Sequence, residues 1–243
     1  MITSKDNDLI KLCNKIKQKK HSREERLCLV ETIKLVNQLY LKGKLTHILV
    51  TSEKYDLVRN YNKCEIIIVS DSIADYLSEA KTTDGVFGIC KIIDNTNYDY
   101  SRCLVLDRLQ DPSNLGAIIR SAHAFGYNTI FAIDSVYPYT YKSIRSSMGY
   151  VFDINYIDTN LDGLLEYKEK YNISLVSADM SGEIVDDFEP KSDNIAIVIG
   201  NEGKGVSREL MNLSDNTIRI PMGDDVESLN ASVSAGIIMY LLK

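Results

Sequence analysis

Apolar runs rich in Val and Ile alternate with helical stretches along the second half of the chain. The runs are CLVLDRL (103–109), TIFAID (129–134), VFDINYI (151–157), ISLVSAD (173–179), NIAIVIG (194–200) and TIRIPM (217–222). Strands that are buried on both faces are apolar almost throughout, and this is typical of a parallel sheet covered by helices on both sides. The pattern therefore predicts an open α/β sheet over residues 103–243.

The first hundred residues predict a smaller α/β unit. Apolar residues at three- and four-residue steps favour a helix from Arg23 to Leu41. Strand-like runs follow at 47–50, 65–69 and 85–93, with a short helix at 71–80 between the last two. The polar stretch DNTNYDYS (94–101) has no periodicity. We therefore expect an N-terminal domain over 1–95, a linker over 96–102 and a second domain over 103–243.

Charge is unevenly distributed along the chain. The net charge is −6, but residues 1–26 hold eight Lys/Arg against four Asp/Glu. A basic arm of this kind neutralises RNA phosphates where its cations cluster, although it is equally compatible with a solvated helix face. Charge alone leaves both interpretations open.

The cysteine and histidine content argues against disulfides and a metal site. The five cysteines are odd in number and form no CxxC pair, which is typical of free thiols in a reducing cytosol. The three histidines lie far apart and belong to no Cys/His cluster, so no metal is expected. The polar first residues and the lack of an apolar run of about 18 residues predict neither a signal peptide nor a membrane partner. We expect a cytoplasmic protein.

Three short blocks lie where predicted strands end, which is where open α/β sheets place their ligand contacts. In the first, Pro112 and Ser113 open a helix that Gly126 can close. Asn114 lies in its first turn and Arg120 falls off its apolar stripe, so both side chains could face a ligand. A helix cap followed by a surface arginine would explain the same residues without any ligand.

The second block is a glycine loop from Gly200 to Gly205, followed by a helix with Ser207 as its expected cap. Glycines let the backbone approach a ligand closely. The loop is not a P-loop, because Val206 stands where the lysine would be required. A dinucleotide-binding loop would follow the first strand of its domain, whereas this loop comes late.

The third block runs from the expected strand end Ile220–Met222 to the start of the last helix. That helix start offers free backbone N–H groups together with the side chains of Ser228 and Asn230. An apolar stripe follows on the helix, formed by Leu229, Val233, Ile237, Tyr240 and Leu241. Periodicity does not separate a core stripe from a dimer surface.

The joint order NxGaxxRsA, GxExxG and IPMxxxxxSLN strongly resembles the SpoU (TrmH-like) family of RNA ribose 2′-O-methyltransferases. The resemblance covers Cys103–Lys243. The segment KKHSREERLCLVETIKLVNQL is similar to part of the substrate-binding domain that precedes the catalytic domain in ribosomal RNA members. Thr32 departs from it, since many relatives have glycine there.

The resemblance implies a deep trefoil knot in the second domain, S-adenosylmethionine as cofactor, an RNA substrate and a homodimer. By motif match, the cofactor would contact six residues: Gly200, Asn201, Gly205, Ile220, Met222 and Leu229. Arg120 matches the catalytic arginine. The polar residues expected around it are Asn114, Glu202, Ser228 and Asn230.

The intact N-terminal domain favours ribosomal RNA, most of all 23S ribosomal RNA, as the substrate implied by the resemblance. Transfer RNA enzymes of the family usually carry short basic helical extensions in its place. A non-catalytic RNA-binding protein of the same fold is the other alternative, and such a protein would be expected to lose Arg120, Glu202 or Asn230. All three are present.

Overall fold

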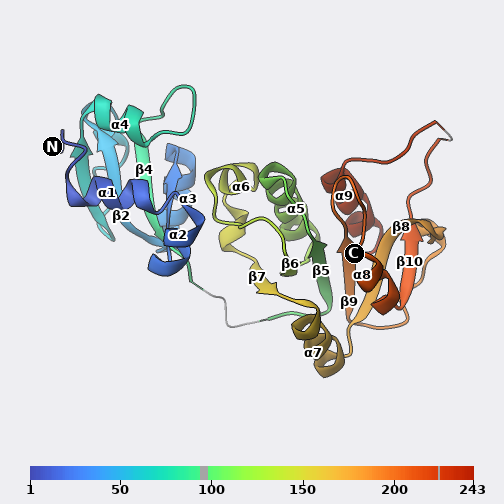
Figure 1. Cartoon of the computed structure of the whole chain (residues 1–243). Helices are drawn as coiled ribbons and strands as arrows, with labels where there is room; N and C mark the ends of the chain where they lie inside the picture. Colours follow the sequence, from blue (N-terminus) through green and yellow to red (C-terminus); the bar gives the residue numbers. More distant parts are fainter. Residues whose placement is uncertain (94–97, 224) are drawn as a thin grey trace. The chain divides into compact units, whose positions relative to one another are not determined.

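A computed structural model describes residues 1–93, 98–223 and 225–243, and they form two compact units (Figure 1). The first unit contains residues 1–93 and 139–152, and the second contains the remainder. Residues 94–97 lie outside the described part, so the start of the expected linker 96–102 and the end of the expected domain 1–95 are not described. Segment 139–152, which the sequence places in the second domain, belongs to the first unit.

The first unit is a four-stranded sheet with helices against it. Its strands are β1 (Leu27–Glu31), β2 (Leu45–Thr51), β3 (Glu65–Val69) and β4 (Val86–Lys91), in the order β1-β4-β2-β3. The helices within its first 93 residues are α1 (Asp8–Lys15), α2 (Lys19–Glu25), α3 (Ile33–Leu41), the 3₁₀ helix η1 (Ser52–Leu57) and α4 (Asp71–Leu77). Only the β2–β3 pair is parallel. The small α/β unit expected from the sequence is present.

The helix predicted over residues 23–41 is wrong, because a strand interrupts it. Leu27–Glu31 forms β1 and pairs antiparallel with β4, with Cys28 opposite Cys90. Arg26 ends α2 in the left-handed region at φ 55°, and Thr32 begins α3 at φ 99° while its hydroxyl accepts from Leu35 N. Neither break occurs at a glycine, so the sequence marks both weakly. A short apolar run such as LCLV fits a buried strand as well as a helix.

Segment 139–152 forms α6 (Tyr141–Ser146) and the 3₁₀ helix η2 (Tyr150–Phe152), and both pack within the first unit. Lys44 Nζ donates to the carbonyl of Phe152 at 2.5 Å. Gly149 has φ +79°, and a Cβ there would come within 2.9 Å of Leu35. The strand predicted over 151–157 is therefore wrong at its start, because residues 151 and 152 are buried in this segment and the strand begins later.

The second unit contains the expected parallel sheet. Its strands are β5 (Arg102–Asp107), β6 (Thr129–Ile133), β7 (Asn155–Thr159), β8 (Ser174–Ile184), β9 (Ile195–Ile199) and β10 (Asn216–Arg219). The order is β10-β8-β9-β5-β6-β7, and every neighbouring pair is parallel. The α/β fold class is confirmed. The strand predicted to end at Met222 ends at Arg219 instead, and Pro221 could not have donated to the ladder.

Helices α5 (Pro112–Phe125), α7 (Leu161–Tyr171), α8 (Arg208–Leu213) and α9 (Ala231–Leu241) accompany the second sheet, with the 3₁₀ helix η3 (Val185–Asp187). As predicted, α5 opens at Pro112 and closes at Gly126, which adopts φ +83°. Helix α9 packs on α5, where a Cβ on Gly236 would lie 3.7 Å from Ser121 Oγ. The trefoil knot stays a prediction. No helix in the described residues has the length and apolar character needed to cross a membrane.

Candidate functional site

A cavity of about 230 Å³ lies within the second unit, beside β8, the end of β9 and the segments that follow β9 and β10. All six residues predicted to contact a cofactor line it: Gly200, Asn201, Gly205, Ile220, Met222 and Leu229. Glu202 and Ser228, which were predicted as polar site residues, also line it. The second and third blocks therefore meet around one cavity.

The sequence did not indicate one wall of this cavity. Ala178, Asp179 and Met180 line it from β8, and Arg219 lines it from the end of β10. These residues could have been predicted only from the order of strands in the sheet, because β8 is the neighbour of both β9 and β10. That order cannot be read from strand patterning alone.

Glycines give the loop after β9 its tight shape. A Cβ on Gly200 would overlap the backbone of Gly205 and Val206, so any other residue would push the loop open. Asn201 and Gly205 exchange two backbone hydrogen bonds of 3.0 and 2.9 Å, and Gly205 adopts φ +66°. The loop thus presents its own backbone to the cavity.

The side chain of Asn201 is used within the structure. Its Nδ2 donates to the carbonyl of Arg108 at 2.8 Å, while its Oδ1 accepts from the N–H groups of Gly203 and Lys204 at 3.0 and 3.1 Å. Because its backbone N–H and carbonyl pair with Gly205, both the side chain and the backbone of Asn201 shape the loop. That the cofactor is held largely by backbone groups stays a prediction.

One hydrogen-bond network joins the three sequence blocks. Asn114 Nδ2 donates to Glu202 Oε1 at 3.1 Å, and Asn230 Nδ2 donates to Asn114 Oδ1 at 3.0 Å. Asn114 is buried in the first turn of α5, so it links the glycine loop to the start of α9. Asn114 therefore contacts Glu202, which is 88 positions away in the sequence, and Asn230, which is 116 positions away.

Glu202 is an ionised hydrogen-bond acceptor in this network. Besides Asn114, it accepts from the backbone N–H groups of Asp111 at 3.0 Å and Gln110 at 3.3 Å. Burial by itself would raise the pKa of Glu202, but these hydrogen bonds outweigh burial and hold the pKa below its ordinary value. A carboxylate with a lowered pKa and three donors is a poor general base, so it holds Asn114 in place.

Asn230 is the N-cap of α9. Its Oδ1 accepts from Ser232 N at 2.9 Å, from Ser232 Oγ at 2.6 Å and from Val233 N at 3.4 Å. The cap fixes where the helix begins: α9 starts at Ala231, whereas the sequence predicts a start within residues 228–230. Ser228 and Leu229 precede it and line the cavity.

Arg120 lies six residues after Asn114 on α5, which is about 9 Å along the helix axis. Its side chain is exposed and forms no hydrogen bond or ion pair within residues 1–93, 98–223 and 225–243. The guanidinium is therefore available to an anion from outside the chain. In the same described residues, no group of three or more His, Cys, Asp or Glu side chains is arranged to hold a metal ion.

Comparison with known families identifies the second unit. The model of the SpoU rRNA Methylase family matches residues 101–240, which include all three blocks and the cavity. The chain belongs to the SpoU rRNA Methylase family. A second model, the MRM3-like substrate binding domain, matches residues 7–88 of this SpoU protein.

Several known proteins are similar to this SpoU chain over different lengths. The 23S rRNA (guanosine(2553)-2′-O)-methyltransferase RlmP of Bacillus subtilis (strain 168) is 26% identical over 244 residues, which cover 100% of this chain and 98% of that protein. The putative TrmH family tRNA/rRNA methyltransferase YacO of the same strain is 38% identical, over 56% of each protein. An AdoMet-bound rRNA methyltransferase from Sinorhizobium meliloti superposes with a TM-score of 0.86 at 25% identity, covering 99% of this chain and 95% of that one.

Proposed function

We propose that this chain is an S-adenosylmethionine-dependent methyltransferase that methylates ribose 2′-hydroxyl groups of RNA. The observation that carries the proposal is the Glu202–Asn114–Asn230 network, because it places polar groups from all three blocks beside one cavity. Glu202 belongs both to this network and to the cavity wall. A cofactor site and a reaction site would thus share a boundary.

The cavity suits a nucleoside with a polar tail. Its wall combines apolar side chains, including Ile220, Met222 and Leu229, with the backbone of the glycine loop. Apolar walls with a few placed polar groups are the usual composition of small-molecule sites. In our proposal, Gly200, Asn201 and Gly205 contact the cofactor through backbone groups, and Ile220, Met222 and Leu229 surround its adenine.

S-adenosylmethionine bound here would supply a methyl group on a sulfonium: in-line attack by the ribose 2′-oxygen would form the O–CH3 bond, break the S–CH3 bond and leave the sulfur as a neutral thioether. Because this electrophile is already activated, the protein has to position the hydroxyl and help its proton leave. Asn114, Ser228 and Asn230 supply hydrogen-bonding groups for this positioning. Glu202 keeps Asn114 in its orientation.

Arg120 is the proposed catalytic residue. A guanidinium is a poor base, so we assign it to holding the adjacent phosphate and polarising the hydroxyl. Proton abstraction by the arginine is the competing role. Its exposure and its lack of a partner in the described part of the chain support a contact with RNA.

The proposed substrate is ribosomal RNA, with 23S ribosomal RNA favoured. A relative that aligns with the whole chain is named as a 23S rRNA enzyme, and residues 7–88 match a substrate-binding domain. Residues 1–95 would bind the RNA and residues 103–243 would catalyse the transfer. A protein acting on ribosomal RNA in a bacterium would work in the cytoplasm.

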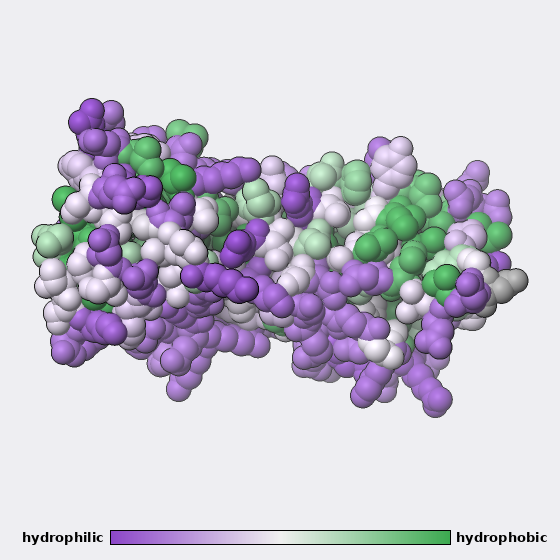
Figure 2. All heavy atoms as spheres, turned by 90° about the horizontal axis from the view of Figure 1, so that it is seen from above, coloured by the Kyte–Doolittle hydropathy of each residue, from purple (hydrophilic) through white to green (hydrophobic). Residues whose placement is uncertain are grey.

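We also propose a homodimer formed through α9. The helix buries Ala235, Ile238 and Met239 against its own unit. From the predicted apolar stripe, Val233, Tyr240 and Leu241 remain exposed at 49%, 54% and 40%. Figure 2 shows apolar surface gathered on the second unit, and such a surface is typical of an interface.

Methyl transfer with an Arg120→Ala variant tests the proposed reaction. Transfer of labelled methyl from S-adenosylmethionine to ribosomal RNA should fall by at least about a hundredfold, because an electrostatic contact in the transition state is lost. Calorimetry should give an unchanged cofactor Kd. Lys191→Ala removes the positive charge of an exposed lysine and is the control for loss of one surface cation. This variant should keep its activity.

Full activity in Arg120→Ala would contradict the role of that arginine. If the wild-type chain binds RNA but binds no S-adenosylmethionine, the non-catalytic alternative is correct. If the chain methylates transfer RNA but not ribosomal RNA, the proposed substrate is wrong and the proposed chemistry is correct.

A further inference from the structure

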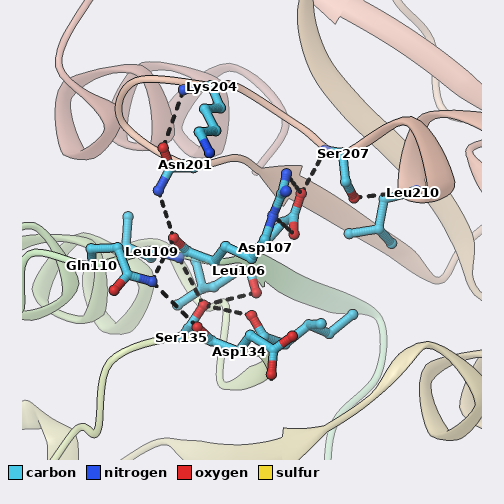
Figure 3. Close-up of polar contacts among 12 residues, drawn as sticks. Leu106, Asp107, Leu109, Gln110, Asp134, Ser135, Asn201, Lys204, Ser207 and Leu210 are labelled. Atoms are coloured by element: carbon cyan, nitrogen blue, oxygen red, sulfur yellow. Dashed lines mark hydrogen bonds and ion pairs between the residues drawn. The ribbon is translucent and has the colours of Figure 1, made fainter.

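A buried carboxylate lies beneath the glycine loop, at the carboxyl end of β5 (Figure 3). Asp107 is the last residue of that strand and is 1% exposed. It belongs to none of the three sequence blocks and does not line the cavity among the described residues. A charge buried to this degree is costly unless it is fully paired, so its partners matter.

Both oxygens of Asp107 have charged or backbone partners. Arg108 donates from Nε to Oδ1 at 2.9 Å and from Nη2 to Oδ2 at 3.2 Å. Ser207 N donates to Oδ2 at 2.6 Å, from the residue that caps α8. The carboxylate therefore ties the end of β5 to Ser207, which follows the glycine loop by two residues.

The next residue ties down the start of the same loop. Arg108 adopts φ 55°, an uncommon conformation for a residue other than glycine. Its carbonyl accepts from Asn201 Nδ2 at 2.8 Å and from Gln110 Nε2 at 3.1 Å. Asp107 and Arg108 thus hold this segment at two points, at Asn201 near the start of the loop and at Ser207 just after it.

The turn that makes these contacts is itself fixed to β6. Ser135 Oγ accepts from Leu109 N at 3.0 Å and lies 3.1 Å from the carbonyl of Leu106 (Figure 3). Arg108 N donates to the carbonyl of Ile133 at 2.9 Å. The loop is therefore anchored to β5 and β6 of the sheet and not only to the helix that follows it.

We propose that Asp107 is a positioning residue that sets the affinity for S-adenosylmethionine by fixing the glycine loop. It contacts no ligand itself and acts through Ser207 and through Arg108 and Asn201. The inference rests on the proposed function, since it names what shapes the cofactor-binding loop. A loop held at two points loses less freedom on binding, so it binds its ligand more tightly.

An Asp107→Asn variant tests this role. The amide keeps the size of the side chain, but one of its two ends is a donor and faces either Ser207 N or the Arg108 guanidinium without an acceptor. We expect the Kd and KM for S-adenosylmethionine to rise at least about tenfold, equivalent to about 1.4 kcal/mol. The KM for RNA and the kcat at saturating cofactor should change less than about twofold.

The matched control is Ser207→Ala. It removes the hydroxyl that accepts from Leu210 N at 3.5 Å but keeps the backbone N–H that binds Asp107. It should lower thermal stability through loss of the cap and leave the cofactor Kd unchanged. A cofactor Kd that rises equally in both variants would show that general destabilisation is the cause, and would overturn the inference.

A second variant decides the question if Asp107→Asn does not fold. Asn201→Asp keeps the oxygen that accepts from Gly203 and Lys204 but places an acceptor against the Arg108 carbonyl. It should also weaken cofactor binding at least about tenfold. An unchanged Kd in the folded variants would overturn the inference, whereas no binding by the wild-type chain would overturn the proposed function instead.

Discussion

At the scale of single residues, Asn114 has the most connected position in the site. Its amide nitrogen donates to Glu202, which fixes its orientation, and its amide oxygen accepts from Asn230. An amide can do this because it offers an acceptor and two donors in one planar group, which a carboxylate cannot. The sequence motifs named all three residues, but only the structure shows that Asn114 contacts both of the others.

Glu202 should make stability depend on pH. Its pKa is lowered in the folded state from an ordinary value of 4.5, so the ionised group stabilises the fold above that pH. This contribution should be lost as the pH falls through the lowered pKa. Glu202→Gln should therefore lose less stability than the wild type between about pH 6 and pH 3.5 in denaturant titrations.

The control for this measurement is Glu189→Gln, which changes an exposed carboxylate in the same unit. It should follow the wild-type pH dependence. An identical pH dependence for Glu202→Gln and the wild type would contradict the network. At neutral pH, Glu202→Gln should also lower methyl transfer about tenfold, since Asn114 is held less firmly.

At the scale of elements, the loop after β9 depends on Gly200. Gly200→Ala would force a Cβ into the backbone of Gly205, so the loop has to open. We expect the cofactor Kd to rise at least about a hundredfold, because the backbone groups facing the cavity move. Calorimetry on the folded variant measures this directly.

Gly126→Ala provides the matched glycine-to-alanine control. Gly126 has φ +83° with no atom near its missing Cβ and lies outside the cavity wall. The substitution should cost about 1 kcal/mol of stability through backbone strain and leave the cofactor Kd unchanged. Equal losses of affinity in the two variants would contradict a specific role for Gly200.

Elements with a clear pattern could be predicted from the sequence. The six parallel strands and the capped helix α5 are all present. Strand β1 was missed because its four apolar residues continue a helical spacing, and its boundaries depend on positive φ at Arg26 and Thr32. The residue types at those two positions do not predict a positive φ angle.

At the scale of the whole molecule, long-range order limited the prediction. Segment 139–152 lies between β6 and β7 in the sequence but belongs to the first unit. No local sequence pattern predicts this assignment. The cavity wall from β8 depends on sheet order, and the importance of Asp107 depends on a contact with a residue 100 positions away. The order of the motifs could predict most of the candidate site residues, but not the residues that hold them in place.

The dimer proposal predicts a change of mass. The double variant Val233→Asp and Tyr240→Asp places two charges on the exposed face of α9, so association should be lost. Analytical ultracentrifugation at about 10 μM should give a dimer for the wild type and a monomer for the variant. Leu57→Asp changes an exposed apolar residue of the first unit and should remain dimeric. A monomeric wild type would contradict the proposal.

The central claim is that this chain methylates ribosomal RNA at a ribose 2′-hydroxyl, and mapping these modifications in cells tests it most directly. Deleting the gene should remove 2′-O-methylation from a single site or a few sites in 23S ribosomal RNA. Expression of the wild-type chain should restore it, and the Arg120→Ala variant should not. A 2′-O-methylation map of total RNA that is unchanged by the deletion would contradict the account.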